Sequence, residues 1–288
     1  MERLSSDLIW EILMYLSSND IFDLFNWNEV DEKFLLYYSK VYHLKHGCQI
    51  DINDGVLTDG RWFLGIKHGI HQVFLSQNGW KIYSDSYYVG GSLNGYKWTW
   101  YPNGNLKSEE FYVNSRLHGR RYDWSHDGFL TSCQNYYLGN QHGINHRYFD
   151  QGKLESTYSY NHGLLDGPSI TYYFNGRMSL YREYDNNKLC QYQYEWWENG
   201  HIKSIQEYKH GVRHGIKITW YSTSISNEQS LRSVKYFVSG EKHGPSRKWY
   251  SNRRLKKISY YYHGLKCDSI IYPRYNRPSD NLSSGEIC

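Results

Sequence analysis

Residues 94–108 read Asn94-Gly95-Tyr96-Lys97-Trp98-Thr99-Trp100-Tyr101-Pro102-Asn103-Gly104-Asn105-Leu106-Lys107-Ser108. An Asn-Gly step between two short strand-like runs is the strongest local signal for a β-hairpin, because both central turn residues then need positive φ. Residues 96–101 supply the first run, and residues 106–112 supply the second. The stretch therefore predicts one hairpin that closes at Asn103 and Gly104.

The glycine that opens this hairpin returns along the chain with a nearly fixed spacing. The repeat-start positions, as we name them, are Gly69, Gly95, Gly119, Gly143, Gly167, Gln191, Gly215 and Gly244. Their spacing is 24 residues from Gly95 to Gly215, with 26 residues before that run and 29 after it. Units of this kind bury their apolar side only against their neighbours. The period predicts a mainly β protein, an elongated single-sheet solenoid of stacked hairpins with about 24 residues per repeat.

Three columns of apolar residues recur with the same period. The first aromatic column, five residues after each start, is Phe74, Trp100, Trp124, Tyr148, Tyr172, Trp196, Trp220 and Trp249. The aliphatic column after the turn is Leu106, Leu130, Leu154, Met178, Ile202, Leu231 and Leu255, and the second aromatic column is Tyr112, Tyr136, Tyr160, Tyr184, Tyr208, Phe237 and Tyr261. Even spacing within a strand places side chains on one face. We therefore expect the columns to form a continuous buried ladder.

Composition agrees with a β-rich, folded chain. The 288 residues include 31 tyrosines, 11 tryptophans and 25 glycines, and no alanine. Aromatic residues favour strands and alanine is the best helix former, so a mainly helical protein is excluded. No apolar run is long enough to span a membrane as a helix, and the N-terminus lacks a signal-peptide pattern. The five cysteines are scattered, which favours free thiols and predicts a cytoplasmic protein.

The repeat unit resembles a known family. Residues 94–108 and their equivalents look like MORN repeats, in the variant seen in bacterial antitoxin-like repeat proteins, over roughly residues 56–272. The resemblance implies the hairpin solenoid and a role as a scaffold or binding surface. The expected organisation is a helical module at 1–45, a linker and degenerate first strand at 46–66, repeats at 67–272 and a polar tail at 273–288.

The first 45 residues follow a helical period instead. Leu8, Ile12, Leu13 and Leu16 have the spacing of one helix face, and two shorter helical runs follow. The string Leu4-Ser5-Ser6-Asp7-Leu8-Ile9-Trp10-Glu11-Ile12-Leu13-Met14-Tyr15-Leu16 resembles the opening of an F-box, although Ser5 stands where that motif usually has proline. A small three-helix F-box-like module is one interpretation. The other is a helical cap that shields the first edge of the sheet.

The F-box resemblance implies a partner. An F-box docks on the Skp-type subunit of a cullin–RING ubiquitin ligase, and the repeat sheet would then recruit a substrate protein. The matching adaptor-binding positions are Leu4, Leu8, Ile9, Ile12, Leu13 and Leu16. An F-box followed by such repeats resembles proteins of large DNA viruses of amoebae, which implies a site of action in the host cytoplasm. The alternative is a structural or membrane-proximal scaffold whose N-terminal helices only cap the sheet.

The sequence carries no recognised catalytic signature. The patterns HExxH, GxSxG and GxxxxGK[ST] are absent, and Glu109 and Glu110 are strand neighbours that should point to opposite faces. Histidines of successive His-Gly steps would lie two strands apart, about 9.5 Å, which is too far for one zinc ion. These histidines, which we expect to be structural, are His68, His118, His142, His214 and His243. We expect a protein that is not an enzyme, with no metal and no cofactor.

The C-terminal part of the chain is basic. Residues 245–288 carry nine lysines and arginines against three carboxylates. A solvated face is the simpler interpretation of this excess, and contact with an anion or an anionic lipid is the alternative. The candidate contacts are Arg253, Arg254, Lys256 and Lys257. Nucleic-acid binding is not expected, because the neighbouring aromatic residues fall in the core columns.

Overall fold

The computed structural model describes residues 47–53, 55–76, 80–222 and 229–273. These residues form antiparallel β-strands, and no helix occurs among them. The chain divides into two compact units. The first holds the described residues up to Gln141 together with Asp150–Gly152, and the second holds His142–Phe149 and the described residues from Lys153 on. The mainly β prediction is confirmed, whereas the predicted helical module at 1–45 lies outside the described residues.

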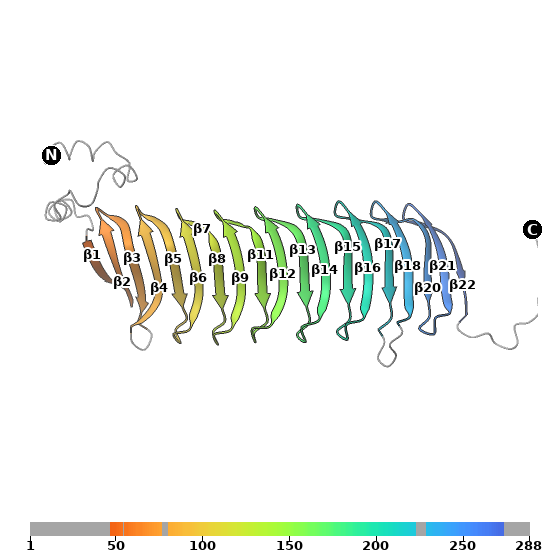
Figure 1. The fold of residues 1–288 in the computed structure, drawn as a ribbon, viewed down its shortest axis with the longest axis horizontal. Coiled ribbons are helices and arrows are strands. Elements are labelled where there is room, and N and C mark those ends of the chain that lie inside the picture. Colours follow the sequence, from red (N-terminus) through yellow and green to blue (C-terminus); the bar gives the residue numbers. More distant parts are fainter. Residues whose placement is uncertain (1–46, 54, 77–79, 223–228, 274–288) are drawn as a thin grey trace, which may run out of the picture. The chain divides into compact units, whose positions relative to one another are not determined.

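The first unit contains ten strands that follow one another in chain order (Figure 1). They are β1 (Gly47–Asn53), β2 (Val56–Phe63), β3 (Ile66–Leu75), β4 (Lys81–Val89), β5 (Ser92–Trp100), β6 (Leu106–Val113), β7 (Arg116–Leu117), β8 (Gly119–Trp124), β9 (Leu130–Tyr137) and β10 (Asn140–Gln141). Strand β6 pairs with both β7 and β8, so these two short strands act as one interrupted strand. Within 46–66, where we expected a linker and a degenerate first strand, the structure has the two paired strands β1 and β2, and Val56 and Thr58 of β2 are good strand formers.

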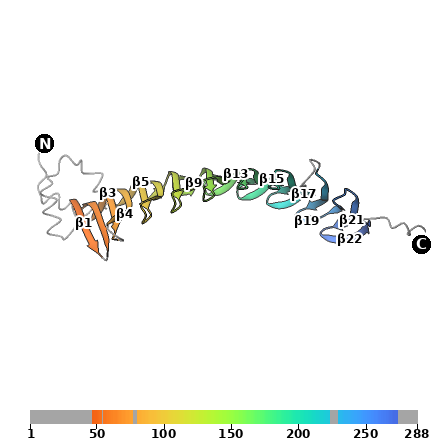
Figure 2. The same ribbon diagram turned by 90° about the horizontal axis from the view of Figure 1, so that it is seen from below.

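The second unit repeats the same arrangement. Its strands are β11 (Gly143–Tyr148), β12 (Leu154–Asn161), β13 (Leu164–Tyr172), β14 (Met178–Asp185), β15 (Lys188–Trp196), β16 (Ile202–Lys209), β17 (Val212–Trp220), β18 (Leu231–Val238), β19 (Glu241–Lys242), β20 (Gly244–Trp249), β21 (Leu255–Tyr262) and β22 (Leu265–Ile271). Strand β18 pairs with both β19 and β20. Figure 2 shows the described strands from a second side, and no helix occurs among the described residues of either unit.

The strand register explains the repeat-start glycines. Each start residue lies opposite an aromatic residue, in the pairs Gly69–Tyr88, Gly95–Tyr112, Gly119–Tyr136, Gly143–Tyr160, Gly167–Tyr184, Gln191–Tyr208, Gly215–Phe237 and Gly244–Tyr261. The seven glycines have φ between 65° and 112°, and Gln191 has φ 56°. Several of them coincide with a register shift against the preceding strand, as at Gly95 beside Ser86 and Tyr88. Glycine recurs because a β-bulge with a left-handed residue is needed there.

The first aromatic column and the aliphatic column meet across each hairpin. Trp100 pairs with Leu106 and Trp196 pairs with Ile202, and the same pairing holds in the other five complete repeats. A register shift precedes every one of these pairs, so the strand ends are bulged. Neighbouring repeats are also linked by hydrogen bonds, because the Tyr173 hydroxyl donates to the Trp196 carbonyl oxygen at 2.8 Å.

The turns differ from the sequence prediction in one respect. Of the two central residues, only Gly104 has positive φ, at 94°. The Gly104 N–H donates to the Tyr101 carbonyl at 2.9 Å, and the Tyr101 N–H donates to the Asn105 carbonyl at 2.9 Å. This is a type I turn followed by a left-handed glycine, and it leaves Asn103 free to adopt ordinary backbone angles.

Burial also differs from the prediction. Nearly all members of the three apolar columns are half-buried, and Met178 is exposed. The residues that are buried in the described strands are mostly small and polar, such as Ser108, Ser156 and Ser204. The reason is that, among the described residues, no second layer covers the sheet. An open sheet encloses short side chains between the longer ones beside them, but it cannot enclose a tryptophan completely. The expected buried aromatic and aliphatic ladder is therefore wrong in its degree of burial.

Candidate binding faces of the sheet

Each unit exposes an aromatic face. The aromatic face consists of the residues one, three and five positions after each repeat start, together with their cross-strand partners. In the first unit, Tyr96 stacks on Trp98 with ring centroids 5.2 Å apart and meets Phe111 at 5.0 Å. In the second unit, Tyr194 lies 6.1 Å from Tyr192 and 5.9 Å from Trp196. Side chains that alternate along a strand share one side of the sheet, so the rings within each of these hairpins lie on the same face.

The centre of the aromatic face is open to solvent. Seven of its large hydrophobic side chains have between 37% and 58% of their surface accessible. They are Ile70, Tyr87 and Tyr96 in the first unit, and Ile144, Tyr192, Tyr236 and Tyr260 in the second. Apolar groups gathered on one face, rather than scattered singly, mark an interaction surface.

The opposite, polar face of the first unit contains paired charges. Glu110 is 6% exposed and accepts a hydrogen bond from the Tyr112 hydroxyl at 2.8 Å. Arg121 lies 3.4 Å from Glu110 and 2.8 Å from Asp123, and Lys97 lies 3.7 Å from Glu110. Burial and the hydrogen bond to Glu110 raise the pKa of Tyr112 well above its usual value. Each cation here has a carboxylate partner, so removal of Glu110 would leave partly buried cations without that partner, which destabilises the fold.

The two neighbouring carboxylates lie on different faces, as predicted. Glu109 accepts a hydrogen bond from the Trp98 indole nitrogen at 3.1 Å on the aromatic face. Glu110 belongs to the network on the polar face. The two therefore do not form an acid–base pair.

A buried histidine, which the sequence did not single out, anchors the start of the first unit. His71 is 6% exposed, and its Nε2 lies 2.6 Å from the Arg61 carbonyl oxygen. Its ring meets Trp62 and Tyr88 edge-on at 5.2 Å and 5.1 Å. Burial lowers the pKa of His71 despite the Arg61 hydrogen bond, so the imidazole is neutral and its Nε2–H donates to the carbonyl.

The histidines of the His-Gly steps pack against rings of the next repeat. His118 meets Tyr137 at 5.3 Å, and His243 meets Tyr262 at 5.4 Å. His142 and His162 lie 4.9 Å apart. Within the described ranges, no group of three His, Cys, Asp or Glu side chains is placed to hold a metal ion. These contacts support a packing role for the step.

The four predicted basic contacts do not come together. Arg253 and Arg254 belong to the turn between β20 and β21, whereas Lys256 and Lys257 lie within β21. The Lys256 ammonium sits 5.1 Å from the Tyr250 ring centre, and Lys257 is paired with Lys248. Because successive strand residues point to opposite faces, Lys256 and Lys257 are on different sides of the sheet.

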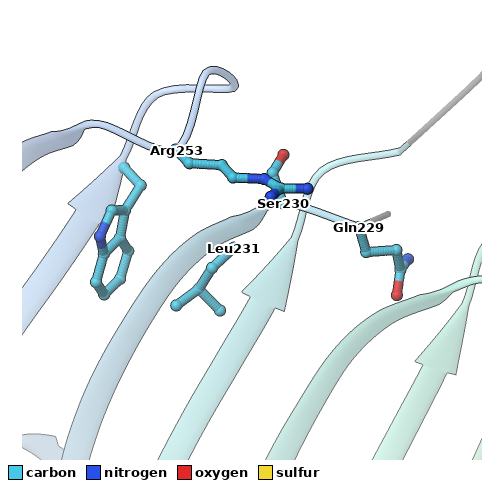
Figure 3. Close-up of a pocket in the computed structure, with 5 residues that line it drawn as sticks. Gln229, Ser230, Leu231 and Arg253 are labelled. Atoms are coloured by element: carbon cyan, nitrogen blue, oxygen red, sulfur yellow. The ribbon is translucent and has the colours of Figure 1, made fainter. Parts of the chain in front are cut away.

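Arg253 lines a hollow at the strand ends of the second unit. The hollow has a volume of about 520 Å³ and is bounded by Gln229, Ser230, Leu231, Trp249 and Arg253. Figure 3 shows the Arg253 side chain reaching from its turn towards Ser230. Arg253 occupies the turn position that Gly104 holds in its hairpin, and it keeps the left-handed conformation with φ 68°. A non-glycine residue costs about 1 kcal/mol or more in that conformation.

Comparison with known proteins adds no assignment. No family model matches the chain, and no curated protein matches it at a significant level. Within the part of the chain that the structure describes, no helix is long and apolar enough to cross a membrane. The predicted adaptor-binding residues Leu4, Leu8, Ile9, Ile12, Leu13 and Leu16 lie outside the described residues.

Proposed function

We propose that this chain is a non-enzymatic adaptor. Residues 1–45 dock on the Skp-type subunit of a cullin–RING ubiquitin ligase, and the repeat sheet recruits a substrate protein. The exposed aromatic face is the observation that supports substrate recruitment by the sheet. The F-box-like string from Leu4 to Leu16 supports docking on the Skp-type subunit. By the resemblance to viral proteins, the adaptor works in the cytoplasm of a host cell.

The aromatic face has the properties of a protein-binding surface. Tyrosine and tryptophan supply large contact areas at a low cost in conformational entropy, and they are enriched among the residues that dominate binding energy. Tyr192, Tyr194 and Trp196 already contact one another, so their rotamers are restricted before a partner arrives. A preorganised surface of this kind loses less entropy on binding.

The adaptor proposal is tested by direct binding to a purified Skp-type subunit. The full chain should bind it, and the double variant Leu8→Glu, Ile12→Glu should not, because two carboxylates would enter an apolar interface. The matched control is Tyr192→Ser, which changes the sheet and leaves the N-terminal segment intact. Circular dichroism should show the same β-sheet content in all three proteins. The proposal fails if the wild-type chain does not bind, or if the double variant binds equally well.

A second candidate function is a structural or membrane-proximal scaffold whose N-terminal segment caps the sheet. The observation that favours it is the edge strand β1, where Ile50 and Ile52 are 65% and 60% exposed. An exposed apolar edge strand promotes association and is usually covered. The double variant at Leu8 and Ile12 separates the two candidates, because a lost cap lowers the melting temperature of the sheet whereas a lost docking surface leaves it unchanged.

A further inference from the structure

Six basic side chains gather on the polar face of the second unit. This set, named the basic face, comprises Arg213, Lys217, Lys235, Lys242, Lys248 and Lys257 on strands β17 to β21. The register places Lys217 directly opposite Lys235, and Lys248 directly opposite both Ser233 and Lys257. Because Ser233 and Lys235 are two residues apart on one strand, all of these side chains share one side of the sheet.

Like charges directly opposite each other destabilise a sheet. Burial lowers the pKa of Lys235, and the charges of Lys242, Lys248, Lys217 and Arg213 lower it further. Burial also lowers the pKa of Lys217, and the nearby Arg213 adds to this while Glu195 opposes it. The register, which places Lys217 directly opposite Lys235, and the half-buried state of both side chains account for these shifts.

On the same face of the first unit, lysine and arginine side chains are paired with carboxylates, whereas Lys217 and Lys235 of the basic face have no such partner among the described residues. Lys97 and Lys217 occupy equivalent positions, two residues after a repeat start. Lys97 lies 3.7 Å from Glu110, whereas no carboxylate of the described residues forms a salt bridge with Lys217 or Lys235. Glu195 is itself bridged to Lys203 at 3.4 Å. Because the equivalent lysine of the first unit is paired, the fold does not require a cluster of unpaired lysines at this repeat position.

The surroundings of the basic face suit a compact anion. The Thr219 and Ser233 hydroxyls lie 2.7 Å apart and hydrogen-bond to each other beside the Lys217–Lys235 pair, and Ser233 is buried. The Lys242 ammonium sits 4.9 Å from the Tyr261 ring centre, and the Arg213 guanidinium sits 5.8 Å from that of Phe237. These contacts hold two cations against rings of the second aromatic column. The face thus presents closely spaced basic groups, of which Lys242 and Arg213 are held against aromatic rings.

We propose that the basic face binds a compact phosphate-bearing anion through Lys217, Lys235, Lys248 and Lys257. Neighbouring strands lie about 4.8 Å apart, so one phosphate group reaches the two ammonium groups of a pair, whereas linked phosphates are needed to reach from Lys217 on β17 to Lys257 on β21. Phosphate oxygens accept charge-assisted hydrogen bonds from lysine and hydroxyl groups. The anion relieves the repulsion that the bare cluster carries. The proposal does not depend on docking to a ubiquitin ligase.

Calorimetric titration of the full chain with inorganic tripolyphosphate tests the proposal. The variant Lys217→Gln, Lys235→Gln should bind at least about tenfold more weakly, because each charge-assisted hydrogen bond contributes about 1.5 kcal/mol or more. The control Lys97→Gln, Lys107→Gln removes the same charge from the first unit and should bind within about twofold of wild type. Affinity should fall as salt rises from about 50 mM to about 200 mM, since the contacts are ionic.

The melting temperature of the variant distinguishes a lost binding site from a misfolded protein. Without ligand, the Lys217→Gln, Lys235→Gln variant should melt at the same or a higher temperature than wild type, because it loses a like-charge pair. Vesicles with and without a phosphoinositide identify the source of the phosphate: binding to these vesicles alone assigns a lipid headgroup, and binding to tripolyphosphate assigns a soluble ligand. The proposal is overturned if neither probe binds below about 1 mM at low salt, or if the control variant loses as much affinity.

Discussion

The left-handed conformation of the repeat-start residues leads to a quantitative prediction. Gly119 has φ 76°, and a Cβ added there would meet nothing within 4 Å. The cost of Gly119→Ala is therefore backbone strain alone, about 1 to 2 kcal/mol. The loss of flexibility in the unfolded chain returns about 0.4 to 1 kcal/mol. We expect a net loss of about 1 kcal/mol in the free energy of unfolding.

Gln191 provides the reverse experiment within the same chain. It is the one repeat-start residue that is not glycine, and it holds φ 56°. Gln191→Gly removes strain of about 1 to 2 kcal/mol and costs about 0.5 to 1 kcal/mol in unfolded-state entropy. We expect a net gain of about 0.5 to 1 kcal/mol. The control Gln191→Ala keeps the strain and removes the polar side chain, so it should remain near wild type.

Urea unfolding followed by tryptophan fluorescence measures these changes. A repeat protein can unfold in segments, so the midpoints should be compared together with hydrogen exchange of the affected hairpin. The reasoning is refuted if Gly119→Ala is as stable as wild type. It is also refuted if Gln191→Gly is less stable than Gln191→Ala.

Three further predictions concern packing and protonation. Gly60→Ala should lower the free energy of unfolding by about 1 to 3 kcal/mol, because the new Cβ would lie 2.0 Å from His71 Nδ1. Thermal unfolding should show this loss of stability. The double variant Gly60→Ala, His71→Ser should be only slightly less stable than His71→Ser alone. The pKa of His71 lies below its unfolded value of 6.5, so the stability of the neutral ring is complete above pH 6.5 and is lost as the pH falls through the folded pKa. Melting temperatures across this range should fall less for His71→Gln than for wild type, whereas His126→Gln, at an exposed histidine, should behave as wild type does. Glu110→Ala should lower the free energy of unfolding by about 3 kcal/mol because the buried charge network loses its carboxylate, and Glu109→Ala, on the opposite face, should cost less in the same urea titration.

The strand pairing follows from the sequence because it depends on spacing. In most repeats an aliphatic residue follows the first-column aromatic by six residues, and the structure pairs Trp196 with Ile202 as a result. The degree to which each side chain is buried could not be predicted from the spacing. A period identifies the side of a sheet, but it does not reveal whether another layer covers that side, so the half-burial of Trp100 and Trp196 could not be predicted.

The basic residues show a second limit of prediction from the sequence. Arg253 to Lys257 attract attention because they are adjacent in sequence, but adjacency in a strand separates Lys256 from Lys257. Lys217 and Lys235 are far apart in sequence and lie directly opposite each other in the sheet. The signal was available, because Lys217 follows Gly215 by two residues and Lys235 precedes Phe237 by two. Counting two residues along each strand from the Gly215–Phe237 pair would have placed Lys217 opposite Lys235.

Hydrogen–deuterium exchange of the full chain, with and without a purified Skp-type subunit, tests the adaptor proposal most directly. Peptides from the strands of both units should be protected in both samples, and the turn around Gly104 should exchange faster. Addition of the subunit should slow exchange in peptides that cover residues 4–16, and this change should be absent in the Leu8→Glu, Ile12→Glu variant. Exchange in residues 4–16 that is the same with and without the subunit would contradict the account.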